Sequence, residues 1–344
     1  MNLPIAIPFL PMEAKISSDI PIGPEWEYEP KWDGFRCIAF RGGDEVELQS
    51  KAGRSLTRYF PEVAEALRSV KAKQFVLDGE LIVPVKGRLS FDDLLQRIHP
   101  AASRVATLAR SHPTQLVAFD LLVDEKGAAV FDQTLKERRR RLESLYAGYL
   151  EDNERVVLSR NTRDPEVARG WIEEMRGQLD GIVAKRMDQP YISGARAMEK
   201  IKWIRSADCV IGGFRYASKG RVVGSLLLGL YDEEGLLNHV GFTSSFRDAE
   251  RKTLTKKLEP LILTPGFTGK APGGPSRWST DRSAEWEPLQ PELVVEVQYD
   301  HFTGDRFRHG TKLLRWRPDK APLQCTMNQV TFESKVSFKL LLAE

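Results

Sequence analysis

The sequence predicts an α+β fold in two domains, for three reasons. A chain of 344 residues is longer than one typical small domain. Its N-terminal part mixes strand-like and helix-like stretches, whereas after about residue 206 short apolar runs alternate with turn residues. An apolar fraction of 41% with 29% charged residues is typical of a folded globular protein. We therefore expect a first domain over residues 1–205 and a second over residues 206–344.

The first domain is expected to combine packed strands with helices. Residues 75–83 and 116–123 are nearly continuous apolar or β-prone runs, which are typical of strands in a packed sheet. Pro61 precedes apolar residues that share one helical face, and Asp164 with Pro165 forms an N-cap and first-turn pair. These two start signals predict two helices.

The second domain is expected to be a small all-β barrel. Short apolar runs separated by Gly, Asp and charged turn residues are typical of such barrels. Four of these runs lie at residues 210–211, 226–231, 237–242 and 293–297. The stretch 265–275, rich in Pro and Gly, is predicted to be a surface loop within this domain.

Charge and composition restrict the possible functions less than they restrict the possible folds. A net charge of +3 permits a basic face for nucleic acid but does not require one. The densest basic run, Arg138 to Arg141, is interpreted as a solvated helix face. No apolar run approaches the roughly 20 residues that span a bilayer, and the N-terminus lacks the basic region of a secretory signal. We expect a cytoplasmic protein with no membrane contact, whose three cysteines are reduced thiols.

The first candidate for chemistry is the segment EPKWDGFR at residues 29–36, in which a lysine precedes an acid and a glycine at a predicted strand edge. A lysine amine attacks phosphorus only when it is neutral, and a metal ion on the phosphate reduces the charge that repels the attack. Such a short string also occurs at ordinary surface turns, so this segment alone does not establish a function.

Four further segments follow in order: VLDGEL at 76–81, AFDLL at 118–122, DGIVAK at 180–185 and KIKW at 200–203. Together with the first, they resemble the motifs of the covalent nucleotidyltransferase superfamily of DNA ligases, RNA ligases and mRNA capping enzymes. The chain is most similar to the small accessory ATP-dependent DNA ligases of bacteria, over nearly its whole length. The resemblance implies a nucleotidyltransferase (adenylation) domain with antiparallel sheets and flanking helices, followed by an OB-fold barrel.

The resemblance also implies roles for the residues of these motifs. Lys31 would attack the α-phosphate of ATP and carry AMP as a phosphoramidate. Glu29 would face the adenine amino group, and Phe119 would stack on the purine. Arg36 and Glu80 would hold the ribose and the nearby phosphate.

Metal and phosphate contacts are implied in the same way. Glu80 and Asp180 would position a hydrated Mg²⁺, for which Mn²⁺ could substitute, with Asp180 the preferred ligand. Lys185, Lys200 and Lys202 would direct positive charge toward the α-phosphate. Because Lys200 and Lys202 are two residues apart on a predicted strand, they should point to one face.

Contacts to the leaving group and to DNA are implied at two further places. Arg317 and Lys320, in RWRPDK at residues 315–320, resemble a terminal element that meets the β- and γ-phosphates and pyrophosphate. Where such ligases usually have an arginine after a serine, this chain has Lys51, which cannot form a bidentate fork. Either Lys51 acts as a point charge on the 5′-phosphate of the nick or Arg54 takes over, and both readings stay open.

The implied function is an ATP-dependent DNA ligase that seals backbone breaks through Lys31-AMP and a 5′-adenylylated DNA. We expect nicked or broken double-stranded DNA as the substrate, a monomer as the active form, and DNA repair near the nucleoid, with repair proteins, as the setting. One alternative is an RNA ligase or a GTP-dependent capping-type enzyme. Another is a catalytically inactive nucleic-acid-binding protein with the same fold.

Overall fold

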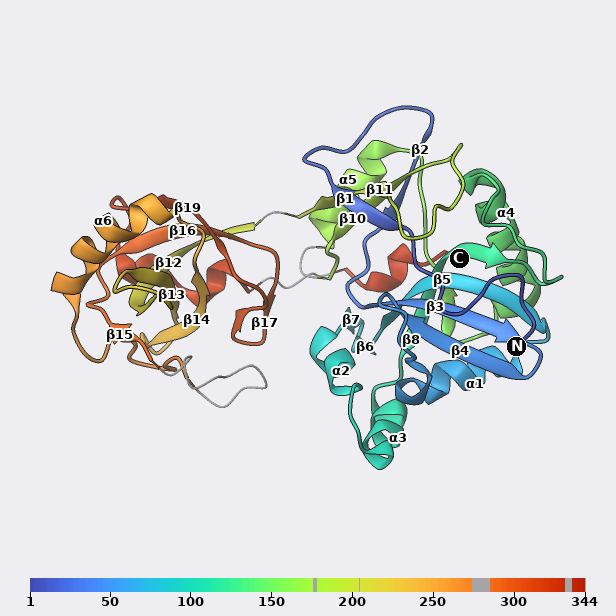
Figure 1. Cartoon of the computed structure of the whole chain (residues 1–344), viewed down its shortest axis with the longest axis horizontal. Coiled ribbons are helices and arrows are strands. Elements are labelled where there is room, and N and C mark those ends of the chain that lie inside the picture. Colours follow the sequence, from blue (N-terminus) through green and yellow to red (C-terminus); the bar gives the residue numbers. More distant parts are fainter. Residues whose placement is uncertain (176–177, 204, 274–284, 332–335, 344) are drawn as a thin grey trace. The chain divides into compact units, whose positions relative to one another are not determined.

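The computed structural model describes residues 1–175, 178–203, 205–273, 285–331 and 336–343. These residues form two compact units (Figure 1). Unit 1 comprises Met1–Lys202 and Ser334–Glu344, and unit 2 comprises Trp203–Glu333. The division after Lys202 lies close to the boundary expected near residue 206.

The C-terminal residues depart from the predicted division, which placed all of 206–344 in the second domain. Phe338 and Leu341 are buried in a core cluster of unit 1 that also contains Trp32. The backbone amide of Arg160 donates to the carbonyl of Leu341 at 2.9 Å. Two apolar residues in a short stretch show no periodicity, so the sequence could not indicate which core they join.

Unit 1 contains two main β-sheets. The five-stranded sheet has the order β4-β3-β5-β8-β9 and is antiparallel except between β8 and β9. The four-stranded sheet has the order β1-β11-β10-β2 and is antiparallel except between β1 and β11. The strands are β1 (Glu13–Ile16), β2 (Trp26–Pro30), β3 (Phe35–Gly42), β4 (Glu45–Ser50), β5 (Gln74–Ile82), β8 (Gln115–Val123), β9 (Val156–Leu158), β10 (Gly181–Arg186) and β11 (Arg196–Lys202), with a small hairpin of β6 (Pro84–Val85) and β7 (Arg88–Leu89). The strands expected at 75–83 and 116–123 are confirmed as β5 and β8, which are almost entirely buried.

The helices of unit 1 pack around these sheets. They are α1 (Pro61–Ser69), α2 (Phe91–Gln96), α3 (Ala102–Ser111), α4 (Leu135–Leu145) and α5 (Pro165–Glu174), with short 3₁₀ or π-helical turns at Thr57–Tyr59, Tyr146–Leu150 and Phe338–Leu341. Both predicted helix starts are confirmed. Pro61 occupies the first turn of α1, and the Asp164 side chain accepts the amide of Glu166 at 2.8 Å at the start of α5.

Helix α4 corrects the interpretation of Arg138 to Arg141 as a solvated face for Arg138 and Arg139, whereas Arg140 is 63% exposed, as expected. Arg138 is 1% exposed and Arg139 is 5% exposed. Two guanidinium nitrogens of Arg138 donate to Asp120 of β8 at 2.7 and 3.0 Å. A buried carboxylate partner compensates the desolvation of this arginine, and no local pattern indicated that Asp120 would face α4.

Unit 2 is built on one curved sheet with a single long helix among its described residues. The strand order is β14-β13-β12-β16-β19, with β15 paired to β12. The elements are β12 (Arg205–Tyr216), β13 (Val223–Tyr231), β14 (Leu237–Thr243), α6 (Asp248–Leu258), β15 (Glu287–Pro288), β16 (Val294–Tyr299), β17 (Phe302–Thr303), β18 (Arg306–Phe307) and β19 (Lys312–Trp316), with 3₁₀ turns at Glu259–Leu261, Pro322–Gln324 and Met327–Gln329. All four predicted apolar runs lie in or next to strands.

The expected barrel is not closed by a continuous ladder. Within the described residues, the edge strands β14 and β19 approach each other through one isolated bridge, between Thr243 and Thr311. The amide of Thr311 donates to the carbonyl of Phe242 there at 3.2 Å. Residues 265–273 lie outside helices and strands, as predicted, and the last two residues of that predicted loop lie outside the described residues.

Two further expectations concern the cysteines and membrane-spanning helices. Cys37, Cys209 and Cys325 are all buried and free, which agrees with the expectation of reduced thiols. In the described parts of the chain, no helix combines the length and the apolar character needed to cross a membrane.

Candidate active site

Unit 1 contains a cavity of about 550 Å³ to which both of its sheets contribute side chains. The lining includes eight of the predicted site residues: Glu29, Lys31, Arg36, Lys51, Glu80, Phe119, Lys185 and Lys200. They come from β2, β3, β5, β8, β10, β11 and adjoining turns. Motifs that are far apart in the sequence therefore meet at one cavity, which is the arrangement expected of a ligand site.

The backbone of Lys31 is held by the segment that carries Asp180. The amide of Lys31 donates to the carbonyl of Gly181 at 2.9 Å, and the amide of Asp180 donates to the carbonyl of Lys31 at 3.0 Å. A Cβ at Gly181 would lie 2.0 Å from a carbonyl oxygen of β11, and one at Gly34 would lie 2.1 Å from a carbonyl oxygen of β5. Both motif positions therefore require glycine for close approach of two backbones.

Asp180 bridges two lysines. Its Oδ2 forms an ion pair with Nζ of Lys31 and another, at 3.3 Å, with Nζ of Lys202. The Lys31 side chain is 24% exposed and that of Asp180 is 9% exposed. The lysine can therefore meet an incoming ligand while the carboxylate stays anchored beside it.

Charges at the cavity shift the protonation of their neighbours. Burial, and then the ammonium charges of Lys31 and Lys202, lower the pKa of Lys200. Burial raises the pKa of Glu80 to about 7, against the opposing charges of Arg36 and Lys31. Lys200 and Lys202 both lie on β11, so the expectation that one strand carries both is confirmed. Shifts of this kind concentrate at functional sites.

The aromatic wall of the cavity is Phe119 on β8. The guanidinium carbon of Arg36 lies 4.6 Å from the ring centroid, and Nζ of Lys185 lies 4.8 Å from it. Arg36 is fixed by two hydrogen bonds to the carboxylate of Asp78, each 2.6 Å long. Asp78 is fully buried and so positions Arg36 from behind the cavity wall.

Lys185 lies at the Glu29 end of the cavity. Its Nζ is 2.7 Å from Oε2 of Glu29, and both side chains are 3% exposed. The same ammonium donates to the carbonyl of Phe119 at 3.4 Å. The antiparallel pairing of β2 with β10 brings the two side chains together, and this pairing could not be read from the sequence.

The carboxylates suit a magnesium ion. Mg²⁺ typically takes one or two carboxylates and completes its shell with waters and substrate phosphate oxygens. Glu80 lines the cavity, and its raised pKa indicates a partly buried carboxylate whose charge a cation would stabilise. The described residues contain no group of three or more His, Cys, Asp or Glu arranged to hold a metal, and Mg²⁺ shared with a nucleotide does not need one.

The two candidates for the 5′-phosphate contact lie in the turn after β4. Lys51 lines the cavity, and its Nζ is 2.9 Å from Oε2 of Glu13. Arg54 has an exposed side chain, and its backbone amide donates to Oγ of Ser50 at 3.0 Å. The geometry leaves the choice between Lys51 and Arg54 open.

The other two predicted residues belong to unit 2. Arg317 Nη1 is 2.8 Å from Oδ1 of Asp208, and Arg317 Nη2 is 2.9 Å from Oδ2 of Asp319. Nζ of Lys320 lies 3.5 Å from the other oxygen of Asp208. The carboxylate of Asp208 therefore holds both cations in one cluster.

The sequence matches family models for both units. The model described as "ATP dependent DNA ligase domain" covers residues 11–202, and the one described as "ATP dependent DNA ligase C terminal region" covers residues 219–320. DNA ligase C1 of Mycolicibacterium smegmatis is 43% identical, and DNA ligase C of Mycobacterium tuberculosis is 41% identical. Each alignment covers 96% of this chain and 96% of the relative.

The chain belongs to the ATP-dependent DNA ligases. It is therefore an enzyme that uses ATP and acts on DNA, and the RNA-ligase and capping-enzyme alternatives are set aside. A solved structure of a Lig E DNA ligase, described as a minimal scaffold for DNA binding, supports the same fold with a TM-score of 0.53 at 17% identity. It covers 90% of this chain and 99% of its own. The second unit is accordingly of the OB-fold type, although its strands form an open path.

Some residues that shape the cavity of this ligase were missed by the sequence motifs. The Tyr191 hydroxyl donates to Asp78 at 2.6 Å and accepts the amide of Met12 at 2.8 Å. These contacts join residues 113 and 179 positions apart. None of the motifs contains Tyr191 or Met12, so no local signal pointed to them.

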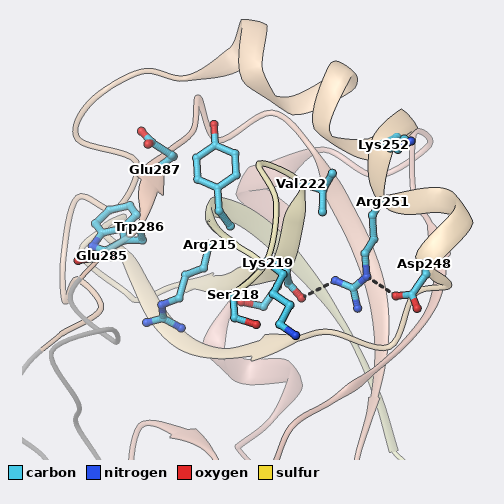
Figure 2. Close-up of a pocket in the computed structure, with 14 residues that line it drawn as sticks. Arg215, Ser218, Lys219, Val222, Asp248, Arg251, Lys252, Glu285, Trp286 and Glu287 are labelled. Atoms are coloured by element: carbon cyan, nitrogen blue, oxygen red, sulfur yellow. Dashed lines mark hydrogen bonds and ion pairs between the residues drawn. The ribbon is translucent and has the colours of Figure 1, made fainter.

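Unit 2 of the ligase has a larger hollow, of about 1140 Å³, that the sequence did not indicate. In Figure 2, Arg215 and Trp286 lie on one side of it and Arg251 with Asp248 on the other. The Arg251 guanidinium donates to Asp248 at 2.7 Å and to the carbonyl of Val223 at 2.8 Å, so it ties α6 to β13. No predicted site residue lines this hollow.

Proposed function

We propose that this ligase seals breaks in duplex DNA in three transfers that begin at Lys31. In the first, Lys31 Nζ forms a bond to the α-phosphorus of ATP, the bond to pyrophosphate breaks, and the amine loses a proton. In the second, an oxygen of the DNA 5′-phosphate takes the AMP and Lys31 is regenerated. In the third, the 3′-hydroxyl attacks the activated phosphate, loses its proton and releases AMP.

The observation that carries this proposal is the position of Lys31. It lines the cavity, is partly exposed, and shares Asp180 with Lys202. Attack requires the neutral amine, and Nζ of Lys31 is held against the carboxylate of Asp180. A second cation that engages Asp180 would weaken that contact and release the amine.

Mg²⁺ is the cation we assign to this place, with Asp180 and Glu80 as its protein ligands. When bound, it would lower the negative charge on the α-phosphate. Lys200 and Lys202 add positive charge from β11 at the position where negative charge builds during the transfer. Mn²⁺ can take the same oxygen ligands.

At the purine end, Glu29 and Phe119 recognise adenine. Glu29 Oε1 is buried and has no hydrogen-bond partner among the described residues, so it can accept a hydrogen from the adenine 6-amino group. Phe119 offers a ring for stacking. Arg36 and Glu80 are paired across β3 and β5 and line the same cavity, and we assign them to the ribose and the adjoining phosphate.

Arg317 and Lys320 are assigned to the departing pyrophosphate, and Lys51 or Arg54 to the DNA 5′-phosphate. Sealing a backbone break requires no base to be read, so binding should rest on phosphate contacts and duplex shape. We propose nicked or broken duplex DNA as the substrate, a monomer as the active form, and DNA repair at the nucleoid of the cytoplasm, with other repair proteins, as the setting.

Incubation with α-labelled ATP and Mg²⁺, followed by a denaturing gel, tests the first transfer. The labelled AMP should stay on the protein and should then move to a nicked duplex on addition of DNA. Omission of the metal should prevent labelling. A protein that seals DNA without ever carrying the label would contradict the covalent route.

A further inference from the structure

Two buried carboxylates and one buried lysine share a face at the adenine end of the cavity. In the register of β2 with β10, Val183 pairs with Glu29 and Lys185 pairs with Glu27. Alternate residues of a strand point to the same side, so the three charged side chains lie together. Glu27 is 5% exposed and Glu29 is 2% exposed. Such carboxylates are costly to keep ionised unless a cation is near.

The ammonium of Lys185 is directed at the wall of the cavity. It contacts Oε2 of Glu29 at 2.7 Å, the carbonyl oxygen of Phe119 at 3.4 Å and the face of the Phe119 ring, 4.8 Å from the centroid. Because the side chain is 3% exposed, its charge is directed at Glu29 and Phe119. Lys185, which also lines the cavity, therefore contacts both residues assigned to adenine.

The two oxygens of Glu29 have different surroundings. Oε2 receives the Lys185 ammonium, whereas Oε1 is buried without a partner among the described residues. The neighbouring Glu27 shows what happens to a carboxylate here, because burial, and then the charge of Glu29, raise the pKa of Glu27. At Glu29 the ammonium of Lys185, 2.7 Å from Oε2, places an opposite charge beside the buried carboxylate.

We propose that Lys185 is a positioning residue for purine selection: it keeps Glu29 ionised and fixes its free oxygen as an acceptor, so that ATP is used in preference to GTP. This inference rests on the proposed adenine site. Adenine presents an amino donor at position 6, which an ionised carboxylate accepts, whereas guanine presents a carbonyl oxygen, which it repels. A protonated carboxyl group can donate to that carbonyl. Loss of the Lys185 charge would therefore admit guanine.

The test compares self-labelling with α-labelled ATP and with α-labelled GTP, each as a ratio of kcat to KM. Lys185→Met preserves the length of the side chain and removes its charge. We expect the preference for ATP over GTP to fall by about tenfold or more, the order of one well-placed hydrogen bond or charge contact of about 1.4 kcal/mol. Lys185→Arg retains the charge and should keep more of the preference than Lys185→Met.

Two further variants show whether Lys185 acts through Glu29. Glu29→Gln places an amide donor at the same position and should also lower the preference, and combining it with Lys185→Met should cause little further loss. Lys200→Met is the matched control, because a phosphate contact should weaken use of both nucleotides and leave their ratio unchanged. The ratio does not depend on the fraction of protein that is folded, and Lys185→Gln replaces the methionine variant if that one does not fold.

An equal loss of ATP and GTP use in Lys185→Met would overturn the inference and return Lys185 to a phosphate or purely structural role. Additive losses in the double variant would overturn the link through Glu29. Absence of any label from ATP in the unaltered protein would instead refute the proposed function, so the two failures can be told apart.

Discussion

The two units hold their key cations in different ways. In unit 1, Lys185 and its partner Glu29 are each 3% exposed, whereas Arg317 of unit 2 is 17% exposed and its partners Asp208 and Asp319 are 12% and 62% exposed. Breaking a buried pair leaves an uncompensated charge and is costly, while water screens an exposed pair and makes its loss mild. The cavity of unit 1 is therefore built to keep its charges in place, and the cations of unit 2 can exchange one anion for another.

Release of Arg317 from its carboxylate partners in unit 2 still costs free energy. Asp208 on β12 pairs directly with Glu296 on β16, and like charges opposite each other on neighbouring strands repel. Arg317 Nη1 lies 2.8 Å from Asp208 and 3.9 Å from Glu296, so it offsets that repulsion. Pyrophosphate carries more negative charge than either carboxylate, which makes it a suitable competitor for Arg317.

The largest effect is expected at Lys31, the proposed nucleophile in unit 1. Lys31→Ala should abolish covalent AMP labelling and sealing from ATP, because no other amine would be in line with the α-phosphate. Labelling on a denaturing gel measures this. Lys15→Ala removes an exposed lysine from the same sheet and should label normally; an Lys31→Ala protein that still labels would place the nucleophile elsewhere.

The next effect separates the two units by reaction step. Arg317→Ala should slow self-adenylylation by about 10²- to 10³-fold, because the charge on departing pyrophosphate loses a partner. Sealing of a nick that already carries a 5′-adenylate, measured without ATP, should stay near the unaltered rate, since no pyrophosphate leaves. Arg315→Ala, which removes a neighbouring arginine paired with Glu296, is the control. Equal losses in both assays would make Arg317 structural or a DNA contact.

A smaller effect is expected at the purine. Phe119→Ala should weaken ATP use by about 1–3 kcal/mol of lost stacking, seen as a higher KM for ATP in self-adenylylation. Phe119→Leu retains apolar volume without a ring, so it separates stacking from packing. Unchanged ATP dependence in both variants would remove Phe119 from the nucleotide site.

The smallest effect distinguishes Lys51 from Arg54. Nick binding should weaken steeply with salt, and removal of one phosphate contact should lower the slope of log affinity against log salt by about 0.9. Of Lys51→Ala and Arg54→Ala, the variant that removes the DNA contact should show this lower slope. Lys73→Ala, at a surface lysine that is 61% exposed, should not. A flat salt response of the unaltered protein would contradict recognition through the backbone.

Sequence reasoning identified the parts of the site that depend on local pattern. The motif at residues 29–36, the strands β5 and β8, and the alternation of Lys200 with Lys202 were all readable because each lies within a few consecutive residues. The contact of Lys185 with Glu29 was not, because it depends on the register of β2 with β10. The register pairs residues about 150 positions apart in the chain, so it produces no periodic pattern in the sequence.

Two other departures have the same kind of cause. The burial of Arg138 depends on Asp120 of a different element, and a charge run by itself indicates solvent exposure. The packing of Phe338 in the core of unit 1 depends on a space left by other segments. Both depend on tertiary contacts, which override the burial that the local composition predicts.

The most direct test of the proposed covalent mechanism is to locate the AMP on the protein. The phosphoramidate formed with labelled ATP would be kept at alkaline pH, digested, and mapped by mass spectrometry to the modified lysine. We expect AMP on the peptide that contains Lys31, at Lys31 itself. AMP on Lys200, on Lys202, or on a lysine outside the cavity would contradict it.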